Sequence, residues 1–326
     1  MLVTDGVVVQ DVRRSFGEVE AVRGISLHAA AGEVTALVGP NGAGKTTLLL
    51  VLATLLVPDS GEVRVAGHDP VTEPDAVRSR MGWSPDVFGM YDNLTAREYL
   101  EFFGAAYRLP RGAAGARAVE LLAMARLSEF AEQPVHVLSR GQKQRLALTR
   151  ALVHRPSVLL LDEPASGLDP HSRVELRVLL RRLAAEGVAV LVSSHILSDL
   201  EEMADRVVFV DQGATVGEHH IADLPKAARR TWRLRAVDQE ALTAAMADRL
   251  HGPPGPHGVD VELSSEDEAA DLLAELVGAG VRITAFAPVG GALEAAYLEL
   301  VDDERRPSEP DFIEPIPYGP DAEAAR

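Results

Sequence analysis

The stretch GPNGAGKTT at residues 39–47 restricts the possible folds more than any other part of the sequence. It matches the pattern G-x-x-x-x-G-K-[ST], in which backbone N–H groups of a glycine-rich loop surround phosphate oxygens and the lysine reaches the outer phosphates. The pattern lies between a predicted strand at 33–38 and a predicted helix that starts near Lys45. This order of strand, loop and helix indicates an α/β nucleotide-binding domain. The residues predicted to bind the nucleotide are Gly39, Pro40, Asn41, Gly42, Ala43, Gly44, Lys45, Thr46 and Thr47.

Short apolar segments alternate with segments of helical period from residue 1 to about residue 220. The apolar segments include VVVQDV, GEVTALVG, SVLLLDE and VAVLVSSH, and the helical segments include TAREYLEFFGAAY and SRVELRVLLRRLAAEG. This alternation predicts a parallel sheet flanked by helices. DRVVFVDQGATVGEHH, at 205–220, has two strand-like runs around a glycine-containing turn and predicts a hairpin that closes the domain. The first domain is therefore expected to occupy residues 1–222.

The rest of the chain predicts a second domain and a tail. Residues 230–301 give strand, helix, strand, helix, strand and helix, with a Pro/Gly break at HGPPGPHG, and indicate a small α+β domain. Residues 302–326 are acidic and rich in proline, and we expect them to be disordered. A chain of 326 residues is long enough for two such domains.

Two carboxylates directly follow another apolar segment. SVLLLDEP, at 157–164, predicts a strand that ends in Asp162 and Glu163. Parallel sheets place ligand sites at the carboxyl ends of their strands. We therefore predict that Asp162 holds Mg²⁺ through water, with the Thr46 hydroxyl as a further ligand, and that Glu163 orients or deprotonates the attacking water.

A third apolar segment also ends in polar residues. VLVSSHILSDL, at 190–200, predicts a buried strand that ends near His195. A single histidine after a strand is often only structural, but this one follows a strand of the sheet that carries the phosphate loop. We predict that His195 donates a hydrogen bond to the γ-phosphate and holds Glu163 and the water in register.

Charge and composition exclude several classes of protein. The formal net charge of −17 argues against a nucleic-acid partner, because affinity for phosphate backbones comes from clustered Lys and Arg. The sequence has no cysteine, which excludes disulfides and thiolate metal sites. Its start, MLVTDGVVVQDVRRSF, lacks the pattern of a signal peptide, and its longest apolar run, TTLLLVLATLLV, is too short to span a bilayer. We expect any membrane-spanning part to belong to a partner.

The stretch LSRGQ at 138–142 precedes VLLLDE by a short helix, where ATP-binding cassette (ABC) proteins carry their LSGGQ signature. Together with the phosphate loop and the paired carboxylates, it makes about 220 residues of the chain resemble this family. The resemblance implies a P-loop NTPase cassette, with a parallel-rich sheet core and a helical subdomain at about 90–150 that contains the signature. It also implies an ATPase whose cofactors are ATP and Mg²⁺.

The resemblance further implies that two cassettes pair head to tail. We expect a second copy of this chain as the partner, and a paralogue is the alternative. The signature residues Ser139, Arg140, Gly141 and Gln142 would then contact the γ-phosphate bound on the partner's phosphate loop. A helix N-terminus with a Ser hydroxyl is suited to binding an anion that a second chain brings to it. By position in the family pattern, Phe16 would stack on adenine, and Asp169, in the loop SGLDP, would help to align the two sites.

The chain departs from the family pattern at two positions. Asp86, in MGWSPDVFGMYDNLT, stands where the family usually has a Gln that reaches Mg²⁺ and the water. Asp86 either binds Mg²⁺, directly or through water, or turns away from the site. Arg140 replaces a Gly, and its guanidinium either strengthens ATP-driven closure near the partner's phosphates or faces solvent.

The segment AFAPVGGALEAAYLELV at 285–301 resembles the extra C-terminal domain of ABC-2 type exporter ATPases, including drug- and antibiotic-resistance proteins. The resemblance implies a peripheral protein on the cytoplasmic face of the cell membrane. It would drive a separately encoded permease through the segment 86–95 and export a drug or antibiotic, a lipid or a peptide.

A soluble cassette ATPase that acts on ribosomes or DNA is the alternative function. The single cassette, the absence of long coiled-coil insertions and the acidic composition argue against it. A dinucleotide-dependent oxidoreductase is excluded, because GPNGAGKTT lacks the G-x-G-x-x-G spacing and carries the phosphate-loop lysine.

Overall fold

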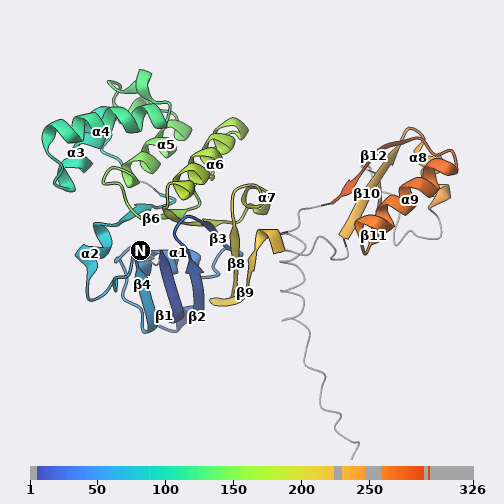
Figure 1. Ribbon diagram of the computed structural model, residues 1–326, viewed down its shortest axis with the longest axis horizontal. Helices are drawn as coiled ribbons and strands as arrows, with labels where there is room; N and C mark the ends of the chain where they lie inside the picture. Colours follow the sequence, from blue (N-terminus) through green and yellow to red (C-terminus); the bar gives the residue numbers. More distant parts are fainter. Residues whose placement is uncertain (1–5, 88, 224–229, 247–257, 290–292, 294–326) are drawn as a thin grey trace, which may run out of the picture.

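The computed structural model describes residues 6–87, 89–223, 230–246, 258–289 and 293. These residues form a nine-stranded sheet with its helices, and a separate three-stranded sheet that follows it in the chain (Figure 1).

The first sheet and its helices contain most of the secondary structure. Its strands are β1 (Val7–Phe16), β2 (Val19–Ala29), β3 (Val34–Val38), β4 (Ser60–Val65), β5 (Met81–Ser84), β6 (Val158–Asp162), β7 (Ala189–Ser194), β8 (Arg206–Asp211) and β9 (Ala214–His220). The helices are α1 (Lys45–Leu52), α2 (Pro74–Arg78), α3 (Ala96–Ala106), α4 (Arg111–Met124), α5 (Arg140–Ala151), α6 (Pro170–Ala185) and α7 (Leu197–Glu201). Short 3₁₀ helices occur at Ser128–Phe130, Val135–Val137 and Ile221–Asp223.

The strand order is β4-β1-β2-β9-β8-β3-β7-β6-β5. The five strands from β8 to β5 are parallel, which confirms the predicted parallel-rich core. The hairpin predicted at 205–220 is also confirmed, because β8 and β9 are antiparallel and joined by Gln212 and Gly213. Both turn residues have positive φ, as a two-residue hairpin loop favours.

The other end of the sheet is antiparallel, which the alternation of segments did not indicate. Strands β1 and β2 are antiparallel, and so are β1 and β4. Only two residues, 17 and 18, connect β1 to β2, and a connection this short joins only antiparallel strands, since a parallel pair needs a long crossover.

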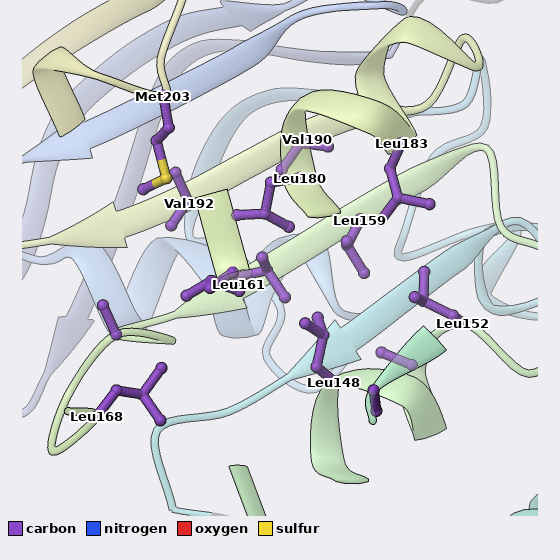
Figure 2. Packing of buried hydrophobic residues seen from close by; sticks show 14 of the residues in the cluster. Leu148, Leu152, Leu159, Leu161, Leu168, Leu180, Leu183, Val190, Val192 and Met203 are labelled. Carbon is purple, nitrogen blue, oxygen red and sulfur yellow. The ribbon is translucent and has the colours of Figure 1, made fainter. Parts of the chain in front are cut away.

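The central strands separate two hydrophobic cores. Strands β3, β6 and β7 are buried along their whole length, as parallel strands covered on both faces should be. Leu159 and Leu161 of β6 face the core shared with helices α3–α6, whereas Leu160 faces the core shared with α1, β1 and β2. Figure 2 shows Leu148 of α5 and Leu180 of α6 in one cluster with Leu159 and Leu161 of β6 and with Val190 and Val192 of β7. This packing places α5 and α6 against the strands that carry the site.

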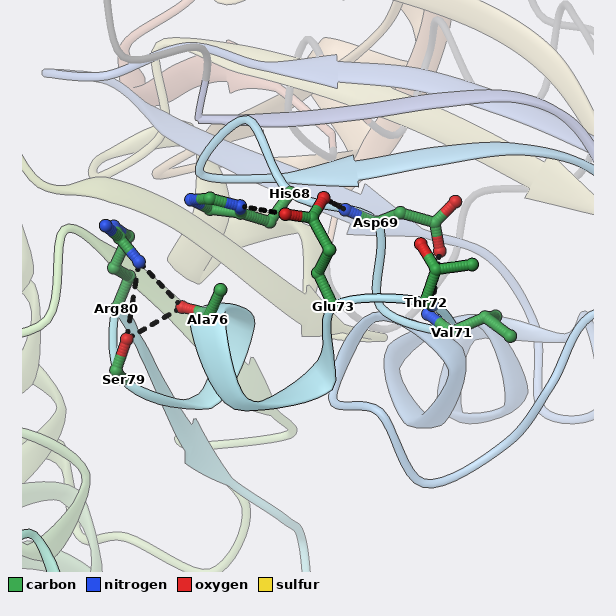
Figure 3. Close-up of polar contacts among 8 residues, drawn as sticks. All are labelled: His68, Asp69, Val71, Thr72, Glu73, Ala76, Ser79 and Arg80. Carbon is green, nitrogen blue, oxygen red and sulfur yellow. Dashed lines mark hydrogen bonds and ion pairs between the residues drawn. The ribbon is translucent and has the colours of Figure 1, made fainter.

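Strands β4 and β5 follow one another in the chain but lie at opposite ends of the sheet. The segment between them, which contains α2, is held by local polar contacts (Figure 3). Glu73 contacts His68 Nδ1 at 3.0 Å through Oε1 and accepts from the Asp69 N–H at 3.3 Å through Oε2. Asp69 in turn accepts from the Val71 N–H at 2.8 Å. These contacts order the crossing that brings the chain from β4 to β5.

The second sheet has the order β11-β10-β12 and is antiparallel throughout. Its elements are β10 (Arg230–Ala236), α8 (Gln239–Ala245), β11 (Val259–Leu263), α9 (Glu266–Gly278) and β12 (Ile283–Pro288), in the predicted order. Leu234, Val261 and Leu272 belong to its separate hydrophobic core. The predicted Pro/Gly break, most of the last predicted helix and the tail 302–326 lie outside the described residues. Among the described helices, none has the length and apolar character that crossing a bilayer requires.

Candidate functional site

The phosphate loop connects the end of β3 to the start of α1 at Lys45. Two of its glycines are required by their surroundings. A Cβ on Gly39 would overlap the carbonyl oxygen of Val210 in β8, and one on Gly44, whose φ is 92°, would lie 2.5 Å from the carbonyl oxygen of Ala21 in β2. The loop is therefore packed between β8 and the β1–β2 hairpin, with its backbone close to both.

Lys45 is buried at the base of this loop, with only 6% of its surface exposed. Its Nζ donates hydrogen bonds to the carbonyl oxygens of Gly39 at 2.7 Å and Pro40 at 3.0 Å. Burial lowers the pKa of Lys45, while the nearby carboxylates of Glu163 and Asp162 act to raise it. The ammonium group is thus placed where the loop surrounds it and two carboxylates face it.

Asp162 is buried at the end of β6 and makes one contact through each carboxylate oxygen. Thr46 Oγ1 donates to its Oδ2 at 2.9 Å, and Ser193 Oγ donates to its Oδ1 at 2.6 Å. Thr46 comes from α1 and Ser193 from β7. The structure therefore brings the ends of three elements together around this carboxylate.

Glu163 follows Asp162 and has a φ of 48°, a left-handed conformation that residues other than glycine seldom adopt. Its backbone N–H donates to Ser193 Oγ at 3.1 Å, and its Oε2 lies 2.8 Å from Nδ1 of His195. About half of the His195 side chain is exposed, whereas the Glu163 side chain is mostly buried. Backbone strain of this kind is found at functional sites, where the surrounding contacts maintain it.

The oxygen atoms around Asp162 suit a magnesium ion. Mg²⁺ prefers oxygen ligands and is usually held by one or two protein side chains together with substrate phosphates and water. The Thr46 hydroxyl and the Asp162 carboxylate lie within hydrogen-bond distance of one another beside the phosphate loop, and both supply oxygen. No cluster of three or more His, Asp and Glu side chains suited to a metal occurs among the described residues. The Thr46 hydroxyl and the Asp162 carboxylate therefore suit a Mg²⁺ ion whose remaining ligands are phosphate oxygens and water.

Phe16, predicted to stack on adenine, ends β1 and is 46% exposed. The guanidinium of Arg14 lies 4.9 Å from the centre of its ring. The same hairpin contacts the phosphate loop through Ala21. The ring is thus available on the hairpin that borders the loop, while its contact with adenine stays a prediction.

The signature turn is at the N-terminus of α5, in the group of helices that also contains α3 and α4 (Figure 1). Ser139 is the N-cap residue, and its Oγ accepts from the Gln142 N–H at 3.3 Å. Gln142 Oε1 accepts in return from the Ser139 N–H at 2.8 Å. This capping box gives the turn a defined shape. Its contact with a nucleotide on a partner chain stays a prediction.

Three further predicted residues are placed by contacts within the chain or by their exposure. The guanidinium of Arg140 lies against Gly167 of the same chain, because a Cβ on Gly167 would be 2.7 Å from Arg140 Nε. Asp169 is the N-cap of α6, where its Oδ1 accepts from the N–H groups of His171 and Ser172, both at 3.0 Å. Asp86 is exposed, and no hydrogen bond or ion pair joins it to another residue in the described part of the chain.

Two residues at the site were not predicted from the sequence. Ser193 joins the Asp162 carboxylate to the Glu163 N–H, and the register of the sheet places it directly beside Asp162. Gln144 of α5 donates through Nε2 to the carbonyl oxygen of Pro164 at 3.0 Å. A polar residue at the end of a buried strand was the available signal for Ser193. A glutamine at this position in a helix gives no such signal.

Comparison with known proteins shows similarity along most of the chain. The profile of the ABC transporter family matches residues 22–166. The daunorubicin resistance ATP-binding protein DrrA3 of Streptomyces coeruleorubidus is 36% identical over 311 residues, which are 93% of this chain and 98% of that protein. The Nod factor export ATP-binding protein I of Paraburkholderia xenovorans (strain LB400) is 38% identical over 207 residues, which are 64% of this chain and 68% of that protein.

Similarity to a solved structure covers about two thirds of the chain. A dimeric ATP-binding cassette in a post-hydrolysis state, bound to ADP and phosphate, superposes with a TM-score of 0.60 and 29% sequence identity. The superposition covers 66% of this chain and 98% of that one. The similar fold is therefore one that binds nucleotide as a pair of cassettes.

Proposed function

This chain belongs to the ABC transporter family of ATP-binding proteins, and on that premise we propose that two copies bind ATP between them and drive a separate membrane permease that exports its cargo. The chain is an ATPase.

The contact between Glu163 and His195 is the observation that carries the assignment of the catalytic residues. The two side chains come from the ends of neighbouring parallel strands, at the edge of the sheet where the phosphate loop begins. Lys45 holds the outer phosphates, Glu163 accepts a hydrogen bond from the attacking water, and His195 fixes the Glu163 carboxylate. A neutral imidazole has one N–H, so only the doubly protonated ring donates to both Glu163 and the γ-phosphate.

Mg²⁺ fits beside Thr46 and Asp162, where it would neutralise charge on the β- and γ-phosphates. Ser193 supports this position from the other side, because it occupies the second oxygen of the Asp162 carboxylate. The hydrogen bond from Ser193 thus keeps the other carboxylate oxygen, Oδ2, directed at Thr46.

The signature turn acts on the partner's nucleotide in this proposal. The solved cassette with a similar fold is dimeric and holds ADP and phosphate, which supports pairing of this chain with a second copy. In such a pair, Ser139 and the first N–H groups of α5 would contact the γ-phosphate bound by the partner's Lys45.

Three exposed apolar side chains suit a permease: Val87 and Tyr91, in the described part of the segment 86–95, and Phe102 of α3. Val87 is 83% exposed, Tyr91 53% and Phe102 47%, and the rings of Tyr91 and Phe102 are in edge-to-face contact with centres 5.0 Å apart. Exposed apolar patches of this kind mark interaction sites. Arg150 of α5 contacts the same region, with Nη1 lying 3.4 Å from the Gly89 carbonyl oxygen. Helix α5 thus extends from the signature turn to the proposed permease contact.

Export rather than import is supported by the similar proteins, which are named for daunorubicin resistance and for Nod factor export. The substrate of the permease is therefore proposed to be a drug or antibiotic, a lipid or a peptide. Action on ribosomes or DNA is not favoured.

Hydrolysis by purified full-length chain with ATP and Mg²⁺ tests the site. Glu163→Gln should hydrolyse ATP about 100-fold more slowly, because it removes the carboxylate that accepts the hydrogen bond from water. The same variant should form an ATP-dependent dimer on gel filtration. Glu129→Gln, at an exposed position outside the site, is the control. Hydrolysis by Glu163→Gln at the wild-type rate would show that another group has this role.

The transport function needs a separate experiment. Tagged Glu163→Gln, isolated with ATP from membranes of the native host, should bring with it a membrane protein with several spanning helices. Recovery of ribosomes or DNA-bound proteins, with no such membrane protein, would support the alternative function.

A further inference from the structure

The first turns of α5 are attached to the loop that follows Glu163 in the same chain. Gln144, in the second turn, is 6% exposed, and its Nε2 donates to the carbonyl oxygen of Pro164 at 3.0 Å. Pro164 is the residue directly after Glu163. Because both atoms of this hydrogen bond are buried, losing it would leave the Pro164 carbonyl without its partner.

Arg140 contacts the same loop three residues further along. The Nε and Cζ atoms of Arg140 lie 2.7 and 2.8 Å from the position of a Cβ on Gly167, so the guanidinium covers a residue that has no side chain. Gly167 also has a φ of 72°, which favours glycine there. The planar guanidinium and the bare backbone therefore fit together.

Leu168 completes the attachment. It is 6% exposed and belongs to the hydrophobic core shared by α5 and α6, where Figure 2 shows it at the edge of the cluster. Its Cδ2 would be 3.7 Å from a Cβ on Gly141, the signature glycine. The signature turn and this loop consequently form one packed unit within a single chain.

The loop between Glu163 and α6 is short and internally hydrogen-bonded. The Ser166 N–H donates to the Glu163 carbonyl oxygen at 3.0 Å, and the Leu168 N–H donates to that of Ala165 at 3.2 Å. Its last residue, Asp169, caps α6. These hydrogen bonds leave the loop little freedom to change shape. When α5 moves the loop residues that it contacts, Glu163 at the start of the loop therefore moves with them.

The charge of Arg140 needs an explanation other than helix stability. A cation in the first turn of a helix opposes the helix dipole, and Arg140 is the first residue of α5. In the described part of the chain it forms no ion pair. The contact with Gly167 gives the Arg140 side chain a defined position, whereas the helix dipole does not favour a cation there.

We propose that Gln144 and Arg140 are positioning residues that fix the loop after Glu163 to the signature helix, so that closure of α5 on the partner's nucleotide places the catalytic carboxylate of its own chain. This inference rests on the proposed function, because it requires α5 to meet ATP held by a second copy. Each ATP would then set the catalytic geometry of the opposite site as well as its own.

Steady-state hydrolysis by the full-length chain tests this coupling. Gln144→Met removes the donor with little change of volume, and Arg140→Gly removes the guanidinium from the exposed end of the helix. Each should lower kcat about tenfold, because a small displacement of a catalytic group has a large effect on rate. The KM for ATP, and the ATP concentration that half-dimerises the chain in a Glu163→Gln background, should stay within about twofold of the parent values. Arg111→Gly is the matched control, because Arg111 is the exposed first residue of α4.

The double variant supplies a second readout that a general structural defect would not produce. If Gln144 and Arg140 hold one loop, the fall in kcat of the double variant should be smaller than the product of the two single effects. If Gln144→Met does not fold, Arg140→Gly alone decides the question, since it removes no buried group.

The hydrolysis measurements distinguish a failure of the proposed function from a failure of the positioning role. A wild-type chain that does not hydrolyse ATP would refute the proposed function, and this inference with it. An active wild type with kcat unchanged in both variants would refute only the positioning role. A raised KM and weaker ATP-driven dimerisation in Arg140→Gly, with kcat unchanged, would also overturn it and would place Arg140 on the partner's phosphates instead.

Discussion

Ser193 Oγ lies between the two carboxylate residues at the end of β6, donating to Asp162 Oδ1 at 2.6 Å and accepting from the Glu163 N–H at 3.1 Å. One buried hydroxyl thereby sets both the direction of the Asp162 carboxylate and the backbone conformation at Glu163. Ser193 and Asp162 are paired residues of adjacent parallel strands, so the register of the sheet fixes this relationship.

Ser193→Ala should therefore lower kcat about tenfold with a smaller change in the KM for ATP, because the carboxylates lose their alignment while the phosphate loop is unchanged. It should also reduce stability by about 1–3 kcal/mol, since it leaves buried polar groups unpaired. Hydrolysis rates and urea unfolding measure the two effects. Ser194→Ala is the matched control, because Ser194 is equally buried but accepts from the Ile196 N–H instead. Equal losses of kcat in the two variants would contradict the role given to Ser193.

His195→Ala should lower kcat by about 100-fold, because Glu163 loses the side chain that holds its carboxylate. His195→Gln should retain part of this activity, since its amide NH₂ can still donate to Glu163 but does not reach Glu163 and the γ-phosphate together, as a doubly protonated ring does. Single-turnover hydrolysis with saturating ATP separates this effect from nucleotide binding. His28→Ala, on an exposed face of β2, should hydrolyse at the wild-type rate. Full activity of His195→Ala would mean that the contact with Glu163 is only structural.

Asp169→Ala should lower the Tm by about 2–4 °C, because Asp169 caps α6. Asp169→Asn keeps an oxygen acceptor and should retain most of the stability. The pKa of Asp169 is lowered by its hydrogen bonds to Ser172 and His171, so its capping contribution is present above the unfolded pKa and is lost as pH falls through the folded one. If Asp169→Asn loses ATP-driven dimerisation while its Tm is retained, the residue has the additional intermolecular role that the family resemblance implies.

His154 should make the protein less stable in mild acid. Burial lowers its pKa to about 4, while the hydrogen bond to the Met81 carbonyl acts in the opposite direction. Nε2 donates that bond at 3.1 Å, and Nδ1 is buried without a partner, so a second proton has no acceptor. Since the unfolded chain takes up this proton near pH 6.5 and the folded chain only near pH 4, the free energy of unfolding falls as pH drops between these values.

The expected loss is about 1–2 kcal/mol, reduced from the full linkage value because the ring is not completely buried. His154→Phe keeps an aromatic ring stacked on Tyr107, whose ring centre is 3.8 Å away, but cannot titrate. Urea unfolding at pH 7 and pH 5 should show a smaller loss in His154→Phe than in the wild type. Parallel losses in the two proteins would assign the acid sensitivity to the carboxylates.

Most residues of the site lie in local sequence patterns. Lys45, Thr46, Asp162, Glu163 and His195 are all predicted from the sequence, because a glycine-rich pattern and polar strand ends are local features of the chain. The fold brings these five residues to one edge of the sheet, although their catalytic roles stay predictions. Local sequence also indicated the parallel core, since buried parallel strands are almost continuously apolar.

Residues whose importance comes from distant neighbours were not accessible in this way. The sequence placed Arg140 near a partner's phosphates or in solvent. Arg140 is exposed, but it also lies against Gly167, in a loop that follows the strand carrying the carboxylates. Gln144 is one polar residue among many in α5, and only the packing of α5 on the sheet turns it toward Pro164. The antiparallel end of the sheet was missed because a two-residue connection carries a weaker signal than an apolar run.

The class of fold, the phosphate loop and the identity of the carboxylates follow from local sequence, because they depend on backbone conformation and periodicity over a few residues. Contacts between distant elements are what bring Ser193 between the two carboxylates and attach the signature helix to the loop after Glu163. Such contacts arise when strands adopt one register and helices pack in one orientation on the sheet. That choice is made by the whole buried core, and no short stretch of sequence contains it.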